Sequence, residues 1–233
     1  MQVRQLFDQE TFTFTYLVID EPTREAIIID PVREQIERDV KLIGELDLKL
    51  KYALETHVHA DHVTSAAELA ERTGALTAAS RLGAACALRH LGEGELIRFG
   101  QSALRVLETP GHTPDSLSFT GGGHVFTGDA LLIRGTGRTD FQNGDANALY
   151  ASITGKLFTL PAPTLVWPGH DYRGHTVSTI GEELRHNPRL AGKSRLEFGV
   201  IMSRLELAPP KRIQIAVPAN LSCGREAGVP AQG

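Results

Sequence analysis

Short apolar runs that are rich in β-branched and aromatic residues recur along the chain, and stretches with helical periodicity separate them. The runs at 12–19 and 26–30 flank a turn that begins at Asp20, so they predict two neighbouring strands. Between 34 and 46, apolar side chains recur at three- and four-residue spacing, which predicts a helix with one buried face. Further strands are expected at 48–55, 104–107, 123–126 and 164–167. Further helices are expected at 64–71, 146–158, 178–186 and 196–205.

This alternation of strands and helices is typical of an α/β domain. The sequence contains no internal repeat and no linker, so we expect a single domain over residues 1–226. Residues 227–233 are rich in Gly, Pro and Ala, and they predict a disordered tail.

Four of the predicted strands lead into loops that carry histidine or aspartate. The strand at 48–55 leads into the motif His57-Val58-His59-Ala60-Asp61-His62. The later loops supply three more such residues, each directly preceded by glycine: His112, Asp129 and His170. Because functional groups of an α/β sheet gather at the carboxyl ends of its strands, we expect these side chains to meet. Imidazole and carboxylate are usual ligands of zinc and non-haem iron, so the set predicts a metal site.

The composition is that of an ordinary globular protein, and it narrows the choice of partners. Of the 233 residues, 41% are hydrophobic and 22% are charged, and the net charge is −4. The absence of a basic stripe argues against nucleic acid as a partner. No segment resembles a membrane span or a targeting signal, so we expect a cytoplasmic protein that does not contact a membrane. We expect Cys86 and Cys223, which are far apart in sequence, to be reduced thiols.

The histidine motif, followed along the chain by His112, Asp129 and His170, resembles the metallo-β-lactamase superfamily. The resemblance extends from Phe12 to about Pro218. It implies an α/β fold, the αββα sandwich of two mixed β-sheets flanked by helices, with a metal at one edge between the sheets. It does not decide the reaction, because the superfamily contains hydrolases, oxidoreductases and nucleases.

Four further segments resemble one family of this superfamily, the persulfide dioxygenases. They are residues 128–142, 168–172, 186–190 and 216–224. The resemblance implies an oxidoreductase that binds one Fe(II) per chain and oxidises glutathione persulfide with O₂ and water to sulfite and glutathione. It also implies that His57, His112 and Asp129 are the iron ligands and therefore the catalytic residues. By resemblance alone, the protein is expected to be a homodimer.

The other histidines and aspartate of the set have two interpretations. The residues concerned are His59, Asp61, His62 and His170. In the persulfide dioxygenases they are retained without a second metal, and hydrogen bonding to the ligands is their expected role. In the two-metal hydrolases of the superfamily the same positions complete the metal sites. The alternative function is therefore a dinuclear hydroxyacylglutathione hydrolase, whose metals would lower the pKa of a bound water.

Glutathione carries two carboxylates, so its binding calls for cationic and hydroxyl side chains. We expect these substrate contacts from Arg138, Tyr172 and Arg189. An alternative role for Arg138, which applies equally to Arg134 and Asp140, is a salt-bridge network that braces the loop after Asp129.

Overall fold

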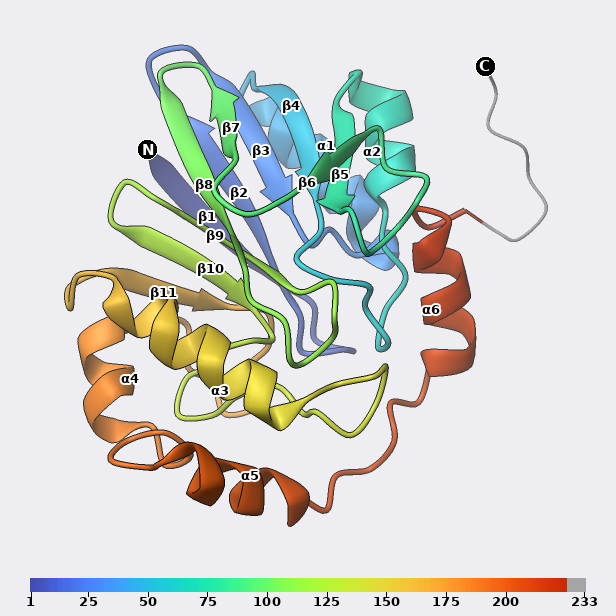
Figure 1. Ribbon diagram of the computed structural model, residues 1–233. Helices are drawn as coiled ribbons and strands as arrows, with labels where there is room; N and C mark the ends of the chain where they lie inside the picture. Colours follow the sequence, from blue (N-terminus) through green and yellow to red (C-terminus); the bar gives the residue numbers. More distant parts are fainter. Residues whose placement is uncertain (226–233) are drawn as a thin grey trace.

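Two six-stranded β-sheets pack face to face in the computed structural model, which describes residues 1–225 (Figure 1). The expected disordered tail at 227–233 lies outside the described residues. The first sheet has the strand order β1-β2-β3-β4-β5-β6 and the second β12-β11-β10-β9-β8-β7. The strands of the first sheet are β1 (Gln2–Phe7), β2 (Phe14–Asp20), β3 (Glu25–Ile29), β4 (Lys49–Leu54), β5 (Leu76–Ser80) and β6 (Arg89–Leu91). Those of the second are β7 (Leu96–Phe99), β8 (Ser102–Glu108), β9 (Leu117–Gly121), β10 (His124–Gly128), β11 (Leu165–Pro168) and β12 (Ser178–Thr179).

Both sheets are mixed. In the first sheet β1, β2 and β3 pair antiparallel, and β3 to β6 pair parallel. In the second sheet only β10 and β11 pair parallel, and the other neighbours are antiparallel. A parallel pair needs a crossover connection. Helices on the outer faces provide it between β3 and β4, β4 and β5, and β10 and β11, whereas residues 81–88 connect β5 to β6 without a helix.

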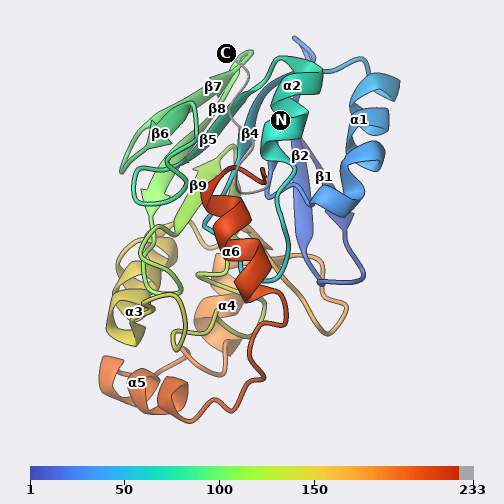
Figure 2. The same ribbon diagram turned by 90° about the vertical axis from the view of Figure 1, so that its right-hand side faces the viewer.

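Most of the helices form the outer two layers, and the last one lies at one edge of the sandwich (Figures 1 and 2). They are α1 (Ile36–Glu45), α2 (Ala66–Thr73), α3 (Ala146–Gly155), α4 (Ile180–His186), α5 (Arg195–Ser203) and α6 (Ile213–Leu221). Ile43 of α1 and Leu69 of α2 pack against Ile28 on the outer face of the first sheet. The helices α3, α4 and α5 pack against the outer face of the second sheet, where they bury Val125 and Val166. The αββα sandwich expected from the sequence is therefore confirmed.

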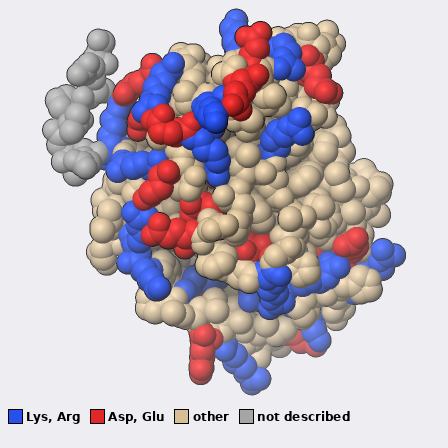
Figure 3. Space-filling model, turned by 180° about the vertical axis from the view of Figure 1, so that it is seen from behind, with Lys and Arg blue, Asp and Glu red and all other residues tan. Residues whose placement is uncertain are grey.

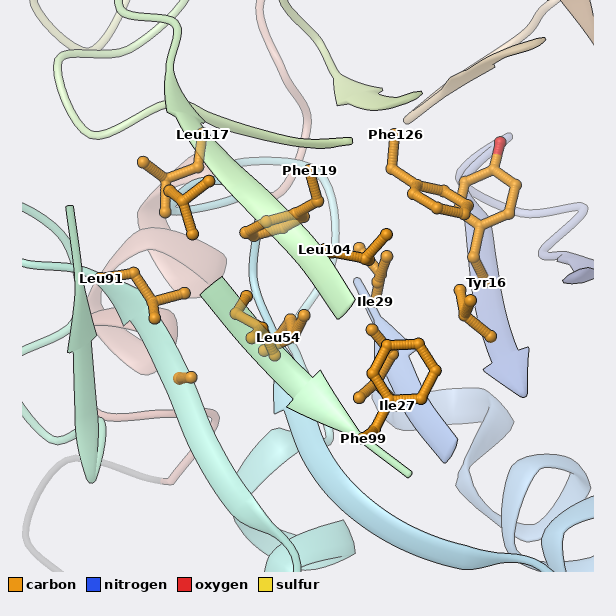
Figure 4. Packing of buried hydrophobic residues seen from close by; sticks show 14 of the residues in the cluster. Tyr16, Ile27, Ile29, Leu54, Leu91, Phe99, Leu104, Leu117, Phe119 and Phe126 are labelled. Carbon is orange, nitrogen blue, oxygen red and sulfur yellow. The ribbon is translucent and has the colours of Figure 1, made fainter. Parts of the chain in front are cut away.

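The main core lies between the two sheets (Figure 4). Every residue of β2 is buried, because Tyr16 and Val18 face the second sheet while Leu17 and Ile19 face the helices. A strand that is covered on both faces reads as a continuous apolar run rather than an alternating one. Tyr16 also donates a hydrogen bond of 2.6 Å from its hydroxyl to the carbonyl of Pro168, which joins the two sheets.

The cysteines differ from the prediction. Cys86 follows β5 and Cys223 follows α6, and the two form a disulfide with a Cα–Cα distance of 6.0 Å. The expectation of two reduced thiols was wrong, because it rested on a sequence separation of 137 residues that the fold closes.

The surface carries charges of both signs. On the face shown in Figure 3, acidic and basic side chains are interspersed, and neither sign forms a continuous patch there. Within residues 1–225, no helix combines the length and the apolar character needed to cross a lipid bilayer.

Candidate metal centre

The loops after four strands bring the predicted ligands to one edge of the sandwich. His57 follows β4, His112 follows β8 and Asp129 follows β10. These three side chains offer ligand atoms that all lie within 4.8 Å of one another. The imidazole rings of His57 and His112 are nearly perpendicular, with centroids 4.9 Å apart. Nε2 of His112 lies 3.6 Å from Oδ2 of Asp129. The structure thus places two imidazoles and one carboxylate around a common point.

Glycines permit the close packing of these loops. Gly128, directly before Asp129, has φ +48, and a Cβ there would lie 2.5 Å from Oγ1 of Thr56. Gly111, directly before His112, has φ +138, and a Cβ there would lie 2.3 Å from the backbone nitrogen of Leu149. A side chain at either position would be both strained and crowded, so the ligand loops require glycine.

Hydrogen bonds fix the tautomers of both histidines. The hydroxyl of Thr56 donates to Oδ2 of Asp30 at 2.8 Å, so its oxygen is left to accept from Nδ1 of His57 at 3.0 Å. Nδ1 of His112 donates to the backbone carbonyl of Arg138 at 2.7 Å. In each ring the proton therefore stays on Nδ1, and the lone pair of Nε2 is available to a metal.

The charge states of the three residues also suit a metal. Burial, together with the neighbouring His59 and His112, holds the pKa of His57 well below its usual value, so its imidazole is neutral. Burial alone would raise the pKa of Asp129, but the neighbouring His170, His112 and His57 outweigh it and hold this pKa far below the usual range. Neutral imidazole and ionised carboxylate are the forms that coordinate metal ions. The residues present therefore fit a divalent transition metal.

His170 lies between two carboxylates. Its Nδ1 is 2.7 Å from Oδ1 of Asp129, and its Nε2 is 3.0 Å from Oδ2 of Asp61 and 3.1 Å from Oγ1 of Thr13. Burial opposes protonation of His170, but Asp129 and Asp61 outweigh it and raise its pKa well above the usual value. Both nitrogens of this ring therefore lie within hydrogen-bonding distance of carboxylates.

The two remaining motif histidines point to other acids. Nε2 of His59 lies 3.2 Å from Oδ1 of Asp30 and 3.4 Å from Oε2 of Glu55. These two carboxylates outweigh burial and raise the pKa of His59 well above its usual value. Nδ1 of His62 lies 3.0 Å from Oδ2 of Asp61. His59, Asp61 and His62 nevertheless offer ligand atoms within 4.8 Å of one another, which is compatible with a second cation.

Known proteins are similar to this chain in sequence and in fold. A model of the metallo-beta-lactamase superfamily matches residues 9–85 and 87–170. The mitochondrial persulfide dioxygenase ETHE1 of Mus musculus is 51% identical over 225 residues, which cover 95% of this chain and 88% of the relative. The crystal structure of ETHE1 from Myxococcus xanthus superposes with a TM-score of 0.95 at 58% identity, and the match covers 97% of this chain and 100% of that one. The chain belongs to the ETHE1 persulfide dioxygenase family of the metallo-β-lactamase superfamily.

A hydrolase of the superfamily is a more distant relative. Hydroxyacylglutathione hydrolase GloC of Haemophilus influenzae is 36% identical over 195 residues, which cover 73% of this chain and 90% of the relative. The similarity to the ETHE1 family is greater in both identity and the share of this chain that it covers.

Arg138 and Arg189, two of the residues predicted to bind substrate, are hydrogen-bonded to other parts of the protein. The guanidinium of Arg138 donates to both carboxylate oxygens of Asp140, at 2.7 and 2.8 Å, and also to the carbonyl oxygen of Ala208 at 2.7 Å. Arg189 donates to the carbonyl of Thr136 at 2.7 Å. Both side chains thus brace the loop around residues 134–140. Of the network expected as an alternative among Arg134, Arg138 and Asp140, the ion pair between Arg138 and Asp140 is present in the structure.

Tyr172 lies at the surface beside His170, and Arg134 connects its loop to α4. Tyr172 is 64% exposed, and its ring stacks on that of His170 with centroids 5.9 Å apart. Among the predicted substrate residues it lies most openly beside the metal-binding residues. Arg134 forms ion pairs with Glu182 and Glu183, which attach the loop to α4.

Sequence reasoning missed several residues that hold the site together. They are Thr13, Asp30, Glu55, Thr56 and Asp115. Two of them had a usable signal, since Asp30 ends a predicted strand and Thr56 directly precedes the histidine motif. For Thr13 and Asp115 the sequence offers no such signal, because only the fold brings them to the loop.

Proposed function

We propose that this chain is a persulfide dioxygenase that oxidises glutathione persulfide with O₂ and water to glutathione and sulfite, using one Fe(II) held by His57, His112 and Asp129. Membership of the ETHE1 family supports the reaction, and the convergence of the three side chains supports the ligand set. Two histidines and one carboxylate are typical of non-haem Fe(II) oxygenases, and they leave coordination positions open for substrates.

One observation in particular supports a single metal. Both ring nitrogens of His170 lie within 3.0 Å of a carboxylate oxygen, Nδ1 next to Asp129 and Nε2 next to Asp61. A ring that donates a hydrogen bond from each nitrogen has no lone pair for a metal. We therefore propose that His170 supports Asp129 and Asp61 through hydrogen bonds, and that His59, Asp61, His62 and His170 are not ligands.

When bound, ferrous iron supplies the redox chemistry that the reaction with O₂ requires and that zinc lacks. The chain's own residues do the rest. Thr56 and the carbonyl of Arg138 keep the Nδ1 protons on His57 and His112 and fix the direction of both rings. His170 holds Asp129 through Oδ1, so Oδ2 faces the ligand histidines.

The glutathione moiety is proposed to contact Arg138, Tyr172 and Arg189. Tyr172 offers an exposed phenol beside His170, and it can donate a hydrogen bond to a carboxylate of the substrate. Arg138 is paired with Asp140, so a substrate carboxylate would have to share or replace that partner.

We also propose that the protein is a homodimer, on family resemblance alone; light scattering would test this. The cytoplasmic location expected from the sequence stays a prediction.

The decisive experiment counts the metal and measures two reactions on the same preparation. The protein is purified without oxygen, its iron and zinc are counted per chain, and O₂ uptake with glutathione persulfide is compared with hydrolysis of lactoylglutathione. We expect one iron per chain and O₂ uptake that is lost in Asp129→Ala and kept in His186→Ala, which changes an exposed histidine of α4. Two metals per chain, thioester hydrolysis and no O₂ uptake would instead establish the hydrolase.

A further inference from the structure

The loop that carries the histidine motif is held to α6 by one side chain. Asn220 is 4% exposed, and its amide nitrogen donates to the carbonyls of His59 and His62, at 2.9 and 2.8 Å. Its amide oxygen accepts from the backbone nitrogen of Thr64 at 2.9 Å. The three bonds all go to the backbone of the loop between β4 and α2. Because that loop is neither helix nor strand, its buried carbonyls depend on such side chains for their hydrogen bonds.

Little apolar contact holds α6 in place. Figure 1 shows this helix at the right-hand edge of the molecule, below α2. Within α6 only Ala216 and Asn220 are buried, whereas Ile215 is 66% exposed. No helix or strand is present in the connection 204–212, which leads to α6. Burial of one alanine contributes little, so the hydrophobic effect alone does not fix the position of Asn220.

The disulfide supplies the missing attachment. Cys223 lies three residues after Asn220, and its bond to Cys86 connects the end of α6 to the loop after β5. The residues packed around this bond are all small, namely Ala67, Ala79, Ala84 and Ala87. The next residue, Gly224, has φ +82, and a Cβ there would lie 2.0 Å from the carbonyl oxygen of Thr64. The chain end thus packs tightly against the same loop that Asn220 binds.

We infer that Asn220 is a positioning residue for the metal-binding loop and that the Cys86–Cys223 disulfide keeps it in position, so that cleavage of the disulfide by a low-molecular-weight thiol weakens metal retention. The inference rests on the proposed function only in that the loop between β4 and α2 holds a metal. Glutathione belongs to this class of thiol, and it is the product of the proposed reaction.

The exchange can begin at Cys86, which is the more exposed of the two cysteines. A thiolate attacks Sγ of Cys86, the S–S bond breaks, and Cys223 leaves as a thiolate that takes up a proton. A second thiol then attacks the mixed disulfide, so the small thiol leaves as its own disulfide and Cys86 becomes a thiol. The protein gains the electrons that the two small thiols lose.

The test measures release of the metal and needs neither persulfide nor O₂. The protein is loaded with Co(II) or Fe(II) under nitrogen, and transfer of the metal to excess chelator is followed by absorbance. For Asn220→Ala, we expect release about 10- to 100-fold faster than in the unaltered protein, the range typical of lost partners around metal ligands. The matched control is Gln214→Ala, which truncates an exposed amide on the same helix and should release metal at the unaltered rate.

A double-mutant cycle tests the connection to the disulfide. Cys86→Ser should also accelerate release of the metal. Millimolar glutathione is then added to the unaltered protein until mass spectrometry shows two reduced cysteines. The treated protein should release metal at the rate of Cys86→Ser. In the Asn220→Ala background, Cys86→Ser should add little, because both changes act through the same hydrogen bonds. Effects that simply multiply would overturn the link between the disulfide and Asn220.

A second variant guards against misfolding of Asn220→Ala. Asn220→Asp keeps the size of the side chain and the acceptor for Thr64, but it loses both donors to the loop carbonyls. We expect faster release here too, and release at the rate of Gln214→Ala would refute the role of Asn220. If Asn220→Asp releases metal faster but the unaltered protein hydrolyses lactoylglutathione without O₂ uptake, the role of Asn220 stands and the proposed function is refuted. Failure of the inference and failure of the proposed function therefore give different results.

Discussion

Replacing Thr56 by valine removes one hydroxyl that connects a buried carboxylate to His57, a proposed metal ligand. The hydroxyl donates to Asp30 at 2.8 Å and accepts from His57 at 3.0 Å, and all three residues are buried. Valine has the shape of threonine without the hydroxyl, so the packing against Gly128 is kept. The change therefore isolates the two hydrogen bonds.

The structure sets the magnitude that we expect. Loss of a hydrogen bond to the charged Asp30 costs about 1.5–3 kcal/mol, and an unpaired buried nitrogen on His57 costs about 1–3 kcal/mol. Asp30 keeps its second bond, in which the backbone nitrogen of Thr56 donates to Oδ1 at 2.7 Å, so the carboxylate is not left unpaired. We expect the metal-free protein to lose roughly 2–5 kcal/mol of unfolding free energy. Metal affinity should fall by about 10- to 100-fold, because His57 loses its fixed orientation.

Two measurements check this expectation. Urea unfolding of the metal-free protein gives the change in unfolding free energy, and competition with a chelator gives the dissociation constant for Fe(II) or Co(II). Thr56→Ser is the matched control, because it keeps the hydroxyl and should bind metal nearly as tightly as the unaltered protein. If the valine and serine variants bound metal equally well, the hydroxyl would have no part in orienting His57.

Three other changes test separate parts of the structure. In Gly128→Ala the new Cβ would meet Oγ1 of Thr56 at 2.5 Å, so we expect roughly 1–3 kcal/mol lower stability by urea unfolding and less bound metal by elemental analysis. Burial raises the pKa of Asp39 to about 6, although Arg38 opposes the shift. Because this carboxyl ionises less readily in the folded protein than in the unfolded chain, the unfolding free energy should fall by roughly 3 kcal/mol as pH rises from 4 through 6. The stability of Asp39→Asn relative to the unaltered protein should therefore increase over that window in urea titrations, and a constant difference would contradict the shift. For Arg138→Ala we expect unchanged iron content and a KM for glutathione persulfide raised about tenfold or more; an unchanged KM would assign the side chain to bracing its loop.

The strands that the sequence predicts are those with the strongest local signal. β2 and β3 are rich in apolar and β-branched residues, because both of their faces are covered. The strand β5 was missed because it reads Leu-Thr-Ala-Ala-Ser, which has little β-propensity of its own. Its place is fixed by parallel pairing with β4 and β6, which no local pattern encodes. The helix α6 was missed for a related reason, since its apolar residues do not form one buried face.

The candidate site likewise contains residues that the sequence predicts and residues that only the fold reveals. Histidines and aspartates at strand ends are visible in the sequence, and the fold brings them to one edge because the four strands that precede them, β4, β8, β10 and β11, all end there. Their hydrogen-bond partners are not visible, because threonine, asparagine and a backbone carbonyl occur everywhere in a chain. Thr13 reaches Asp61 and His170 across 48 and 157 residues of sequence. Only the packing of β2 beside the loop after β11 makes that contact.

The number of metals that the site binds depends on the hydrogen-bond partners of the histidines and aspartates. The motif itself is common to one-metal and two-metal members of the superfamily, so the ligand types cannot separate them. In this structure the partners of His170 bear on the choice. His170 is separated from Asp61 by 109 residues, yet its Nε2 lies 3.0 Å from that acid and its Nδ1 lies 2.7 Å from Asp129. If both nitrogens donate, the ring carries a positive charge beside the two acids, where a second cation would otherwise bind. On this reasoning, replacing His170 changes the charge of the site before it removes any ligand.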